Sequence, residues 1–236
     1  MRKFLLAAVA MAAFTAPATA AVVYSNNFDA ENGGNSQLNY NGFNGLSVTG
    51  GTVDLVKSGD FGITCAGGTG ACVDLDGSTG NAGLTSSGSY TFNAGDRVAL
   101  SFLFSGNQRG GANDGFATRF LFASAVSGTY GSESTNFGSQ NYGSFTAQPG
   151  LFLTISGILP SYAMTDFEFY FIASNAGSVN FNFEDLGNDN VGVVIDDVSL
   201  SIGAVPEPSA WALMILGFGA VGAAARRRAA GKAALT

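Results

Sequence analysis

Apolar and polar residues alternate with a period of two in four stretches of this chain, which is the pattern of a half-buried β-strand. These stretches are Arg97–Phe104, Asp166–Ile172, Val179–Phe183 and Val191–Ile202. In the last stretch the alternation places Val194, Val198 and Leu200 on one face of the strand. Asp196 has the same parity, so we expect its carboxylate to point inward, where it needs a partner or a cation.

Six further segments predict strands, because they are short, rich in apolar residues and separated by turn signals such as Asn41-Gly42 and Asp76-Gly77. They are Val22–Phe28, Leu46–Val56, Cys72–Leu75, Ser89–Asn93, Phe116–Ala123 and Leu151–Ile155. The Ser/Gly/Asn-rich segment 127–150 is compatible with a hairpin and a long loop. Many short strands without a convincing amphipathic helix predict an all-β fold, and we expect a two-sheet antiparallel β-sandwich of the jelly-roll type.

The first twenty residues have the three parts of a secretory signal peptide. Arg2 and Lys3 form the charged start, residues 4–14 are apolar, and small residues precede the predicted cleavage between Ala20 and Ala21. The apolar run is too short to span a bilayer stably, which argues against an N-terminal anchor. We therefore predict an exported protein with a folded domain of residues 21–205 and a tail of residues 206–236.

The tail carries an uncharged stretch followed by a basic cluster. Residues 209–225 are seventeen positions without a charge, the lower limit for a transmembrane helix, and three arginines follow at 226–228. By the positive-inside rule these arginines stay cytoplasmic, so the domain lies outside. The pattern predicts a marginal or transient inner-membrane anchor, and an anchor that is retained for life is the alternative.

The motif ahead of this stretch gives a specific resemblance. Pro206, Glu207, Pro208, Trp211 and Ala212 stand at the positions of the PEPxxWA variant of the PEP-CTERM sorting domain of Gram-negative bacteria, which the tail resembles. The resemblance implies recognition by an exosortase, a membrane-embedded cysteine transpeptidase, with cleavage at or near Pro-Glu-Pro. It also implies a cell-surface or extracellular destination, in bacteria whose sorting accompanies exopolysaccharide production and biofilm or floc formation.

Acidic residues outnumber basic ones by sixteen to four within residues 21–205, which gives a formal charge of −12. A nucleic-acid binder needs cationic side chains to neutralise phosphates, so that class is excluded. The excess of carboxylates favours solubility or the binding of a hard cation such as calcium. The chain has no histidine, which excludes Ser-His-Asp and Cys-His catalysis.

Cys65 and Cys72 are the two cysteines of the chain, and three of the six residues between them are glycine. In an exported protein this spacing predicts a disulfide that closes a flexible loop. A metal pair is the weaker alternative, because neither a histidine nor a further thiol is present to complete the site.

The two ends of the domain carry a second, less specific resemblance. Asn26–Glu31 and Val194–Leu200 are similar to the terminal strands of galactose-binding-like carbohydrate-binding jelly-roll modules. In those modules the first and last strands lie close together, and a carboxylate from each can share a structural calcium ion. This resemblance implies Asp29 or Glu31 together with Asp196 as calcium ligands. The alternative is that Asp196 accepts backbone hydrogen bonds at a strand edge and that no metal binds.

Asp74 and Asp76 form a second acidic pair, on one strand face beside a Gly-rich turn. Their spacing does not fit an EF-hand loop, so surface turn chemistry is favoured over a metal site, and a ligand-binding edge is a further alternative. Tyr130 and Tyr142 are the candidates for stacking on a sugar ring, because residues 21–205 contain no tryptophan. The twenty phenylalanines are more typical of core packing.

Three classes of function remain. We expect a non-catalytic surface or matrix protein that engages extracellular polysaccharide or neighbouring proteins. A calcium-dependent carbohydrate-binding module with a defined glycan ligand is the alternative. A glycosidase or lyase using paired carboxylates such as Asp74 and Asp76 is the third class, but two acids at i and i+2 on one strand do not by themselves flank a bond.

Overall fold

The computed structural model describes residues 20–187, 189–205, 215–222 and 226. One compact unit spans Ala20–Val205, and a separate unit comprises the two terminal segments. In the tail, residues 215–222 form a helix. No helix in the described ranges is both long enough and apolar enough to cross a membrane. Residues 1–19 of the predicted signal peptide, and the rest of the predicted transmembrane stretch 209–225, lie outside the described residues.

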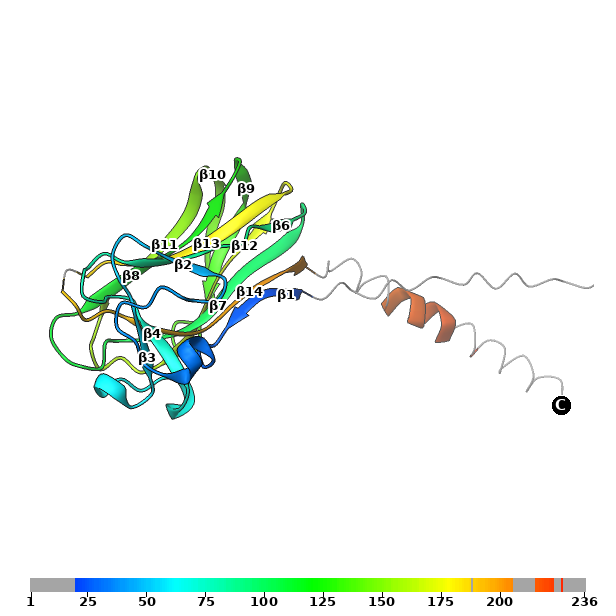
Figure 1. The fold of residues 1–236 in the computed structure, drawn as a ribbon. Coiled ribbons are helices and arrows are strands. Elements are labelled where there is room, and N and C mark those ends of the chain that lie inside the picture. Colours follow the sequence, from blue (N-terminus) through cyan, green and yellow to red (C-terminus); the bar gives the residue numbers. More distant parts are fainter. Residues whose placement is uncertain (1–19, 188, 206–214, 223–225, 227–236) are drawn as a thin grey trace, which may run out of the picture. The chain divides into compact units, whose positions relative to one another are not determined.

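Eight strands form the larger sheet of the domain (Figure 1). Their order is β10-β9-β12-β7-β14-β4-β3, and β1 pairs with β14 off this path. The first and last strands of the domain are therefore neighbours, as the resemblance of its two ends implied. The strands are β1 (Ala21–Asn26), β3 (Asp54–Lys57), β4 (Ala71–Asp74), β7 (Asp96–Ser105), β9 (Val126–Glu133), β10 (Gln140–Ala147), β12 (Thr165–Ala173) and β14 (Val194–Ala204).

The smaller sheet has the order β11-β8-β13-β5-β2, with β6 paired to β13. Its strands are β2 (Leu46–Thr49), β5 (Gly83–Ser86), β6 (Tyr90–Phe92), β8 (Asp114–Phe122), β11 (Gly150–Ile158) and β13 (Gly177–Asp185). The connections contain three short 3-10 helices, η1 (Glu31–Gly34), η2 (Asp60–Gly62) and η3 (Ala66–Gly68). Every strand pair within the described part of the chain is antiparallel, which confirms the predicted two-sheet antiparallel sandwich.

Phenylalanines from both sheets fill the space between them. Phe102 of β7 packs edge-to-face on Phe183 of β13 with ring centroids 4.9 Å apart. Phe120 of β8 stacks on Phe169 of β12 at 5.0 Å. All four rings are buried, and each fully buried phenylalanine contributes about 1.5–3 kcal/mol. The alternating phenylalanines therefore form the core, as predicted.

The predicted strand Leu46–Val56 is wrong, because this segment forms two strands in different sheets. β2 ends at Thr49 and β3 begins at Asp54. Between them Gly50 has a φ of 77°, and a Cβ there would lie 2.4 Å from the carbonyl oxygen of Asn81. A residue with a side chain fits neither this backbone conformation nor this close approach. The chain therefore turns here and crosses from one sheet to the other.

The segment 127–150 contains more strand than its composition suggests. β9 and β10 pair as a hairpin, and residues 134–139 connect them. β5 was not predicted from the sequence, because Leu84 is its one large apolar residue. The pairing of β5 with β13 and β2 defines this strand, and such long-range partners leave no signal in the local pattern.

A β-bulge in β14 changes which of its side chains face the core. The pairing of β14 with β7 shifts register just after Asp196, and Asp197 has a φ of 49°. Ile195 and Val198 therefore both enter the main core, whereas Val194 packs in a separate cluster with the two cysteines. The Asp196 carboxylate points inward as expected, but it does not share the main core with Val198. Asp196 is buried, but on the other face of the sheet, beneath the cysteine loop.

Candidate functional site

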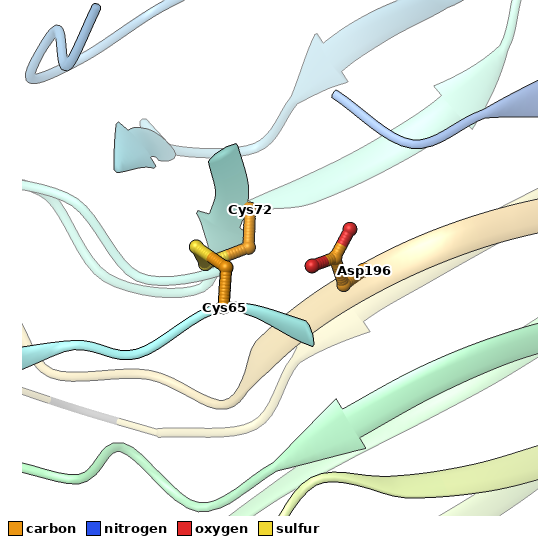
Figure 2. Close-up of side chains that lie close together, drawn as sticks. All are labelled: Cys65, Cys72 and Asp196. Atoms are coloured by element: carbon orange, nitrogen blue, oxygen red, sulfur yellow. A yellow bond between two sulfur atoms is a disulfide. The ribbon is translucent and has the colours of Figure 1, made fainter. Parts of the chain in front are cut away.

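The predicted disulfide is present and lies beside Asp196. An S–S bond of 2.06 Å joins Cys65 to Cys72 and closes the loop that carries η3. Figure 2 shows the Asp196 side chain next to this disulfide. In the described ranges these form the only group of three or more Cys, Asp or Glu side chains whose possible metal-binding atoms all lie within 4.8 Å of one another. Sulfurs bonded to each other are not thiolates, so this group is not a metal site.

The backbone satisfies the carboxylate of Asp196, which is 3% exposed. Its Oδ2 accepts a hydrogen bond from the N–H of Ala66 at 3.0 Å, and its Oδ1 accepts one from the N–H of Asp197 at 2.8 Å. Burial raises the pKa of Asp196 to about 7, and these two bonds oppose the rise. The carboxylate thus holds the disulfide loop against the bulge of β14.

Asp29, on the segment after β1, reaches the same neighbourhood. Its Oδ1 accepts a hydrogen bond from the N–H of Ala71 at 2.9 Å, and a Cβ on Gly70 would lie 1.7 Å from that oxygen. Glycine at position 70 is therefore required for this contact. Burial raises the pKa of Asp196 and of Asp197, and the charge of Asp29 adds to both shifts. The segment after β1 thus places Asp29 near enough for its charge to act on Asp196 and Asp197, and a calcium ion shared between Asp29 and Asp196 stays a prediction.

Glu31 has a different set of partners. It is buried at the start of η1, where its Oε1 accepts hydrogen bonds from Nδ2 of Asn26 at 2.8 Å and from the N–H of Asn44 at 2.7 Å. The hydroxyl of Tyr40 donates to Oε2 at 3.3 Å. These contacts tie the segment before β2 to β1. None of them is shared with Asp196, so Asp29 is the acid from this end of the chain that accompanies it.

A second group of buried carboxylates lies where β4 and β13 end and β8 begins. Asp74, the last residue of β4, is 1% exposed, and its Oδ2 forms an ion pair with Arg109. Its Oδ1 accepts hydrogen bonds from the N–H groups of Asp76 at 3.2 Å and Gly192 at 2.9 Å. Burial raises the pKa of Asp74 to about 7, and the charge of Arg109 opposes the rise. Asp74 is therefore a buried acid with a full set of partners.

Asp76 lacks such partners although it is only two residues away. It is 0% exposed, and neither of its carboxylate oxygens accepts a hydrogen bond from the described chain. Asp185, the last residue of β13, is 1% exposed, and its Oδ1 is unpartnered in the same way. The expectation of surface turn chemistry for Asp74 and Asp76 is therefore wrong, because the end of β13 and the segment before β14 cover both acids.

Sequence reasoning missed three residues of this group: Asp114, Asp185 and Arg109. The first residue of β8 is Asp114, and the last residue of β13 is Asp185, so each acid stands where an apolar alternation begins or ends. That signal is visible in the sequence. Arg109 also stands out as one of four basic residues in the domain. The meeting of strand ends from both sheets at one place is not visible locally.

Tyr130 and Tyr142 do not join the acidic groups. They lie on β9 and β10, and three strands separate β9 from β4 in the larger sheet. Tyr130 packs against the main core, with its ring 5.9 Å from that of Phe145. Tyr142 is 42% exposed, and its hydroxyl lies 3.0 Å from Oγ of Ser132. The four candidate ligand contacts therefore do not form one site.

The outer face of the larger sheet carries a shallow depression of about 400 Å³. Arg97 of β7 bridges two acids at its edge, with Nη2 3.2 Å from Glu133 and 2.5 Å from Glu168. The guanidinium also lies 4.0 Å from the ring centre of Tyr170. The depression is lined by Ser101, Phe102, Leu103, Glu133, Asp166, Phe167, Glu168 and Asp197.

Residues 204–228 match the PEP-CTERM protein-sorting motif. This match confirms the resemblance read from Pro206, Glu207, Pro208, Trp211 and Ala212, which lie outside the described residues. The motif implies an exported protein that is sorted by an exosortase.

No curated protein matches this chain. The solved structures to which the chain is similar include the following carbohydrate-binding modules. The C-terminal family 22 module of Clostridium thermocellum Xyn10B is 15% identical with a TM-score of 0.40, over 79% of this chain and 96% of that chain. The CBM22-1 xylan-binding domain of Paenibacillus barcinonensis Xyn10C is 11% identical with a TM-score of 0.31, over 81% and 99%. The family 11 module of Clostridium thermocellum, in complex with a β-1,3-1,4-mixed-linked tetrasaccharide, is 18% identical with a TM-score of 0.21, over 82% and 100%. Likeness at this level carries no argument about what this chain binds.

Proposed function

We propose that this chain is an exosortase-sorted protein of the cell surface or extracellular matrix, with residues 21–205 as its non-catalytic β-sandwich cargo. The position of the sorting motif carries this proposal. β14 ends at Ala204, and the motif match begins at residue 204. Cleavage at or near Pro-Glu-Pro therefore leaves every described strand on the same side of the cut.

Properties of the domain support an extracellular destination. Its disulfide suits an oxidising compartment, and its formal charge of −12 favours solubility after release. Sorting of this kind accompanies exopolysaccharide production, so we infer that the released domain resides in or near a polysaccharide matrix. Association with a biofilm is the finer form of this proposal.

The surroundings of the paired acids support a non-catalytic role. A glycosidase needs two carboxyl groups that flank the scissile bond and that the substrate can reach. Asp74 is 1% exposed and paired with Arg109, and Asp76 is 0% exposed. A sugar ring therefore has no access to either carboxylate. Turnover of a polysaccharide that is lost in Asp74→Asn would contradict this view.

Carbohydrate binding on the outer face of the larger sheet is the second candidate function, and the depression beside Arg97 favours it. Glu133, Asp166 and Glu168 line it with carboxylate oxygens, which accept hydrogen bonds from sugar hydroxyls. The ring of Tyr170 lies against the Arg97 guanidinium at the edge of the depression. Asp197 lines the depression and lies in the bulge of β14, next to Asp196. An ion bound at Asp29 and Asp196, as predicted, would therefore make binding at the depression depend on calcium.

Peptide mapping of the native protein tests the sorting proposal. Protein from the cell surface or culture medium is digested and its C-terminal peptide identified by mass spectrometry. We expect the chain to end at or near Pro-Glu-Pro, and we expect the intact tail when the host lacks its exosortase. Peptides beyond Trp211 in the extracellular form would contradict the proposal.

Binding to the host's own exopolysaccharide tests the second candidate. Residues 21–205 are measured in calcium and again in EDTA, and saturable binding is expected to weaken in Glu168→Gln. Glu184→Gln is the matched control, because Glu184 pairs with Arg119 on the smaller sheet as Glu168 pairs with Arg97. An equal loss in both variants, or no binding by the unmodified domain, would rule out this surface.

A further inference from the structure

The unpartnered carboxylates at the end of the sandwich lead to an inference that does not depend on the proposed function. We propose that Asp76 and Asp185, with Asp114 and the backbone carbonyl of Asp189, bind a hard divalent cation, and that Ca²⁺ is the ion of best fit. The site lies where β4 and β13 end and β8 begins. It is distinct from Asp196, which lies at the disulfide.

The first support for this site is the buried carboxylate of Asp76. Its side chain is 0% exposed, and both of its carboxylate oxygens lack a hydrogen-bond donor in the described chain. A buried carboxylate in this condition is strongly unfavourable unless it binds a proton or a cation. Arg109, the cation that reaches this group, is already paired with Asp74. Asp76 therefore needs a positive partner that the described residues do not supply.

Asp185 brings a second unpartnered oxygen to the same place. Its Oδ2 accepts the N–H of Gly187 at 2.7 Å, whereas its Oδ1 accepts no hydrogen bond. A Cβ built on Gly187 would lie 3.0 Å from Oδ2 of Asp185, 3.6 Å from its Oδ1, and 3.5 Å from Oδ2 of Asp76. Two carboxylates from different sheets thus approach one common point, with a glycine beside them.

A second glycine lies on the other side of Asp76. A Cβ on Gly80 would lie 3.4 Å from the carbonyl oxygen of Asp189 and 3.6 and 3.7 Å from the two carboxylate oxygens of Asp76. Gly80 and Gly187 do not have the positive φ that requires glycine elsewhere in this chain. Their small size instead keeps side-chain atoms away from the carboxylate oxygens of Asp76 and Asp185 and from the carbonyl oxygen of Asp189.

Charge makes a cation a better partner than water. Asp54 and Asp114 add to the negative potential around Asp76, although one oxygen of each accepts a hydrogen bond from Asn39 and Asn107 respectively. Burial, and then the charges of the neighbouring acids, raise the pKa of Asp76 to about 7. A buried water offers hydrogen bonds but no charge, whereas a divalent ion offsets two carboxylates at once.

The donor set selects the class of ion. Every candidate ligand is an oxygen, the chain has no histidine, and both cysteines are in the disulfide, so zinc and other softer metals are disfavoured. Mg²⁺ requires a near-ideal octahedron, whereas Ca²⁺ accepts six to eight oxygens in irregular geometry. In the described ranges no three acids at this place have ligand oxygens within 4.8 Å of one another, so binding of an ion would require these side chains to move closer together.

Residues 21–205 are a suitable sample, because this unit contains both sheets, the disulfide and both buried hydrophobic clusters. The oxidised domain is stripped with EDTA and exchanged into metal-free buffer at pH 7.5. Bound calcium is counted by native mass spectrometry, and the melting temperature is measured against added CaCl₂. At a free concentration of about one hundred times Kd we expect a rise of about 5–10 °C.

Three variants separate ligation from a structural role. Asp76→Asn and Asp185→Asn should each lose most of the calcium-dependent rise. Their melting temperatures in EDTA should equal or exceed that of the unmodified domain, because each removes a repelling charge. Asp196→Asn is the matched control, a buried acid with satisfied oxygens. It should melt lower in EDTA and keep the calcium response of the Asp76 site.

Three results would overturn the proposal. The first is the absence of calcium binding by the unmodified domain at about 10 mM CaCl₂. This concentration exceeds the Kd of calcium sites, which reaches about 1 mM for the weakest class. The second is an undiminished calcium response in both Asp76→Asn and Asp185→Asn. The third is loss of the whole response in Asp196→Asn alone, which would assign the ion to the terminal strands instead.

Discussion

Asp196 and Asp76 are buried to the same degree and differ in how the chain accommodates them. They are 3% and 0% exposed, and burial is the largest cause that raises the pKa of each to about 7. Each oxygen of Asp196 accepts a backbone N–H, one from the disulfide loop and one from the bulge of β14. Neither oxygen of Asp76 accepts any hydrogen bond from the described residues.

This difference shows that burial alone does not identify a metal site. A bulge and a loop can supply the donors that a buried carboxylate needs, and both oxygens of Asp196 are satisfied in this way. Asp76 has two glycines and further acids around it instead of donors. The number of satisfied oxygens is therefore more informative about function than the depth of the side chain.

The largest effect is expected from Asp196→Ala. This change leaves the N–H groups of Ala66 and Asp197 without their acceptor in a partly buried region, and each lost partner costs about 1–3 kcal/mol. We expect the free energy of unfolding in urea to fall by about 2–4 kcal/mol, both with calcium and with EDTA. A loss seen only in calcium would instead indicate that Asp196 ligates an ion, and would remove the contrast with Asp76.

The second effect concerns the loop that supplies one of those donors. The paired change Cys65→Ser and Cys72→Ser opens a link between residues seven apart in sequence, which is worth about 2–3 kcal/mol by loop entropy. Faster hydrogen exchange at the Ala66 amide should accompany this loss. The calcium response assigned to Asp76 should persist, because none of its proposed ligands lies in the loop between the two cysteines. Loss of both together would mean that the two acidic groups are not independent.

Local sequence patterns predicted the features that depend on local structure. The alternating phenylalanines of β7, β12 and β13 correctly predicted residues of the core. The sorting motif was identified from the sequence alone because its residues are contiguous. The parity of Asp196 failed because a bulge shifts the register after it. The burial of Asp76 was missed because its cover comes from Asp185 and Gly192, more than one hundred residues later. No local pattern encodes such a contact.

The third effect is the dependence of stability on pH in EDTA. A carboxyl group whose pKa is higher in the folded protein binds its proton more tightly when folded. Its stabilising contribution is therefore present below the usual value of 3.8 and is lost as the pH rises toward about 7. The charges of Asp54, Asp114, Asp185 and Asp189 act on Asp76. Asp74 accepts the N–H of Asp76 and is paired with Arg109.

We expect the unmodified domain in EDTA to lose stability between pH 5 and pH 7.5, and Asp76→Asn to lose about 1 kcal/mol less over this range. Denaturant unfolding at four or five pH values measures both slopes. Excess calcium should flatten the slope of the unmodified domain, because the ion favours the ionised acids. Parallel slopes for the two proteins in EDTA would contradict a raised pKa of Asp76 in the folded domain.

The smallest change in stability is expected from Asp29→Asn, which tests the link between the segment after β1 and Asp196 on β14. The amide oxygen of the substituted side chain can still accept the N–H of Ala71, and Asp29 is exposed, so the loss of stability should be about 0.5–1 kcal/mol. The charge of Asp29 contributes to the raised pKa of Asp196, so that pKa should fall. A carboxyl ¹³C NMR titration measures the shift, with Asp60→Asn, another exposed acid, as the control.

The number of calcium ions bound by Asp29→Asn tells whether Asp29 and Asp196 share an ion. If Asp29 and Asp196 share no ion, Asp29→Asn lowers the pKa of Asp196 and leaves calcium binding unchanged. If they share one, the variant removes one bound calcium from the native mass spectrum while Asp76→Asn removes the other. The two acidic groups would then differ in how each holds its ion. One would combine backbone donors with a cation, and the other would depend on the cation alone.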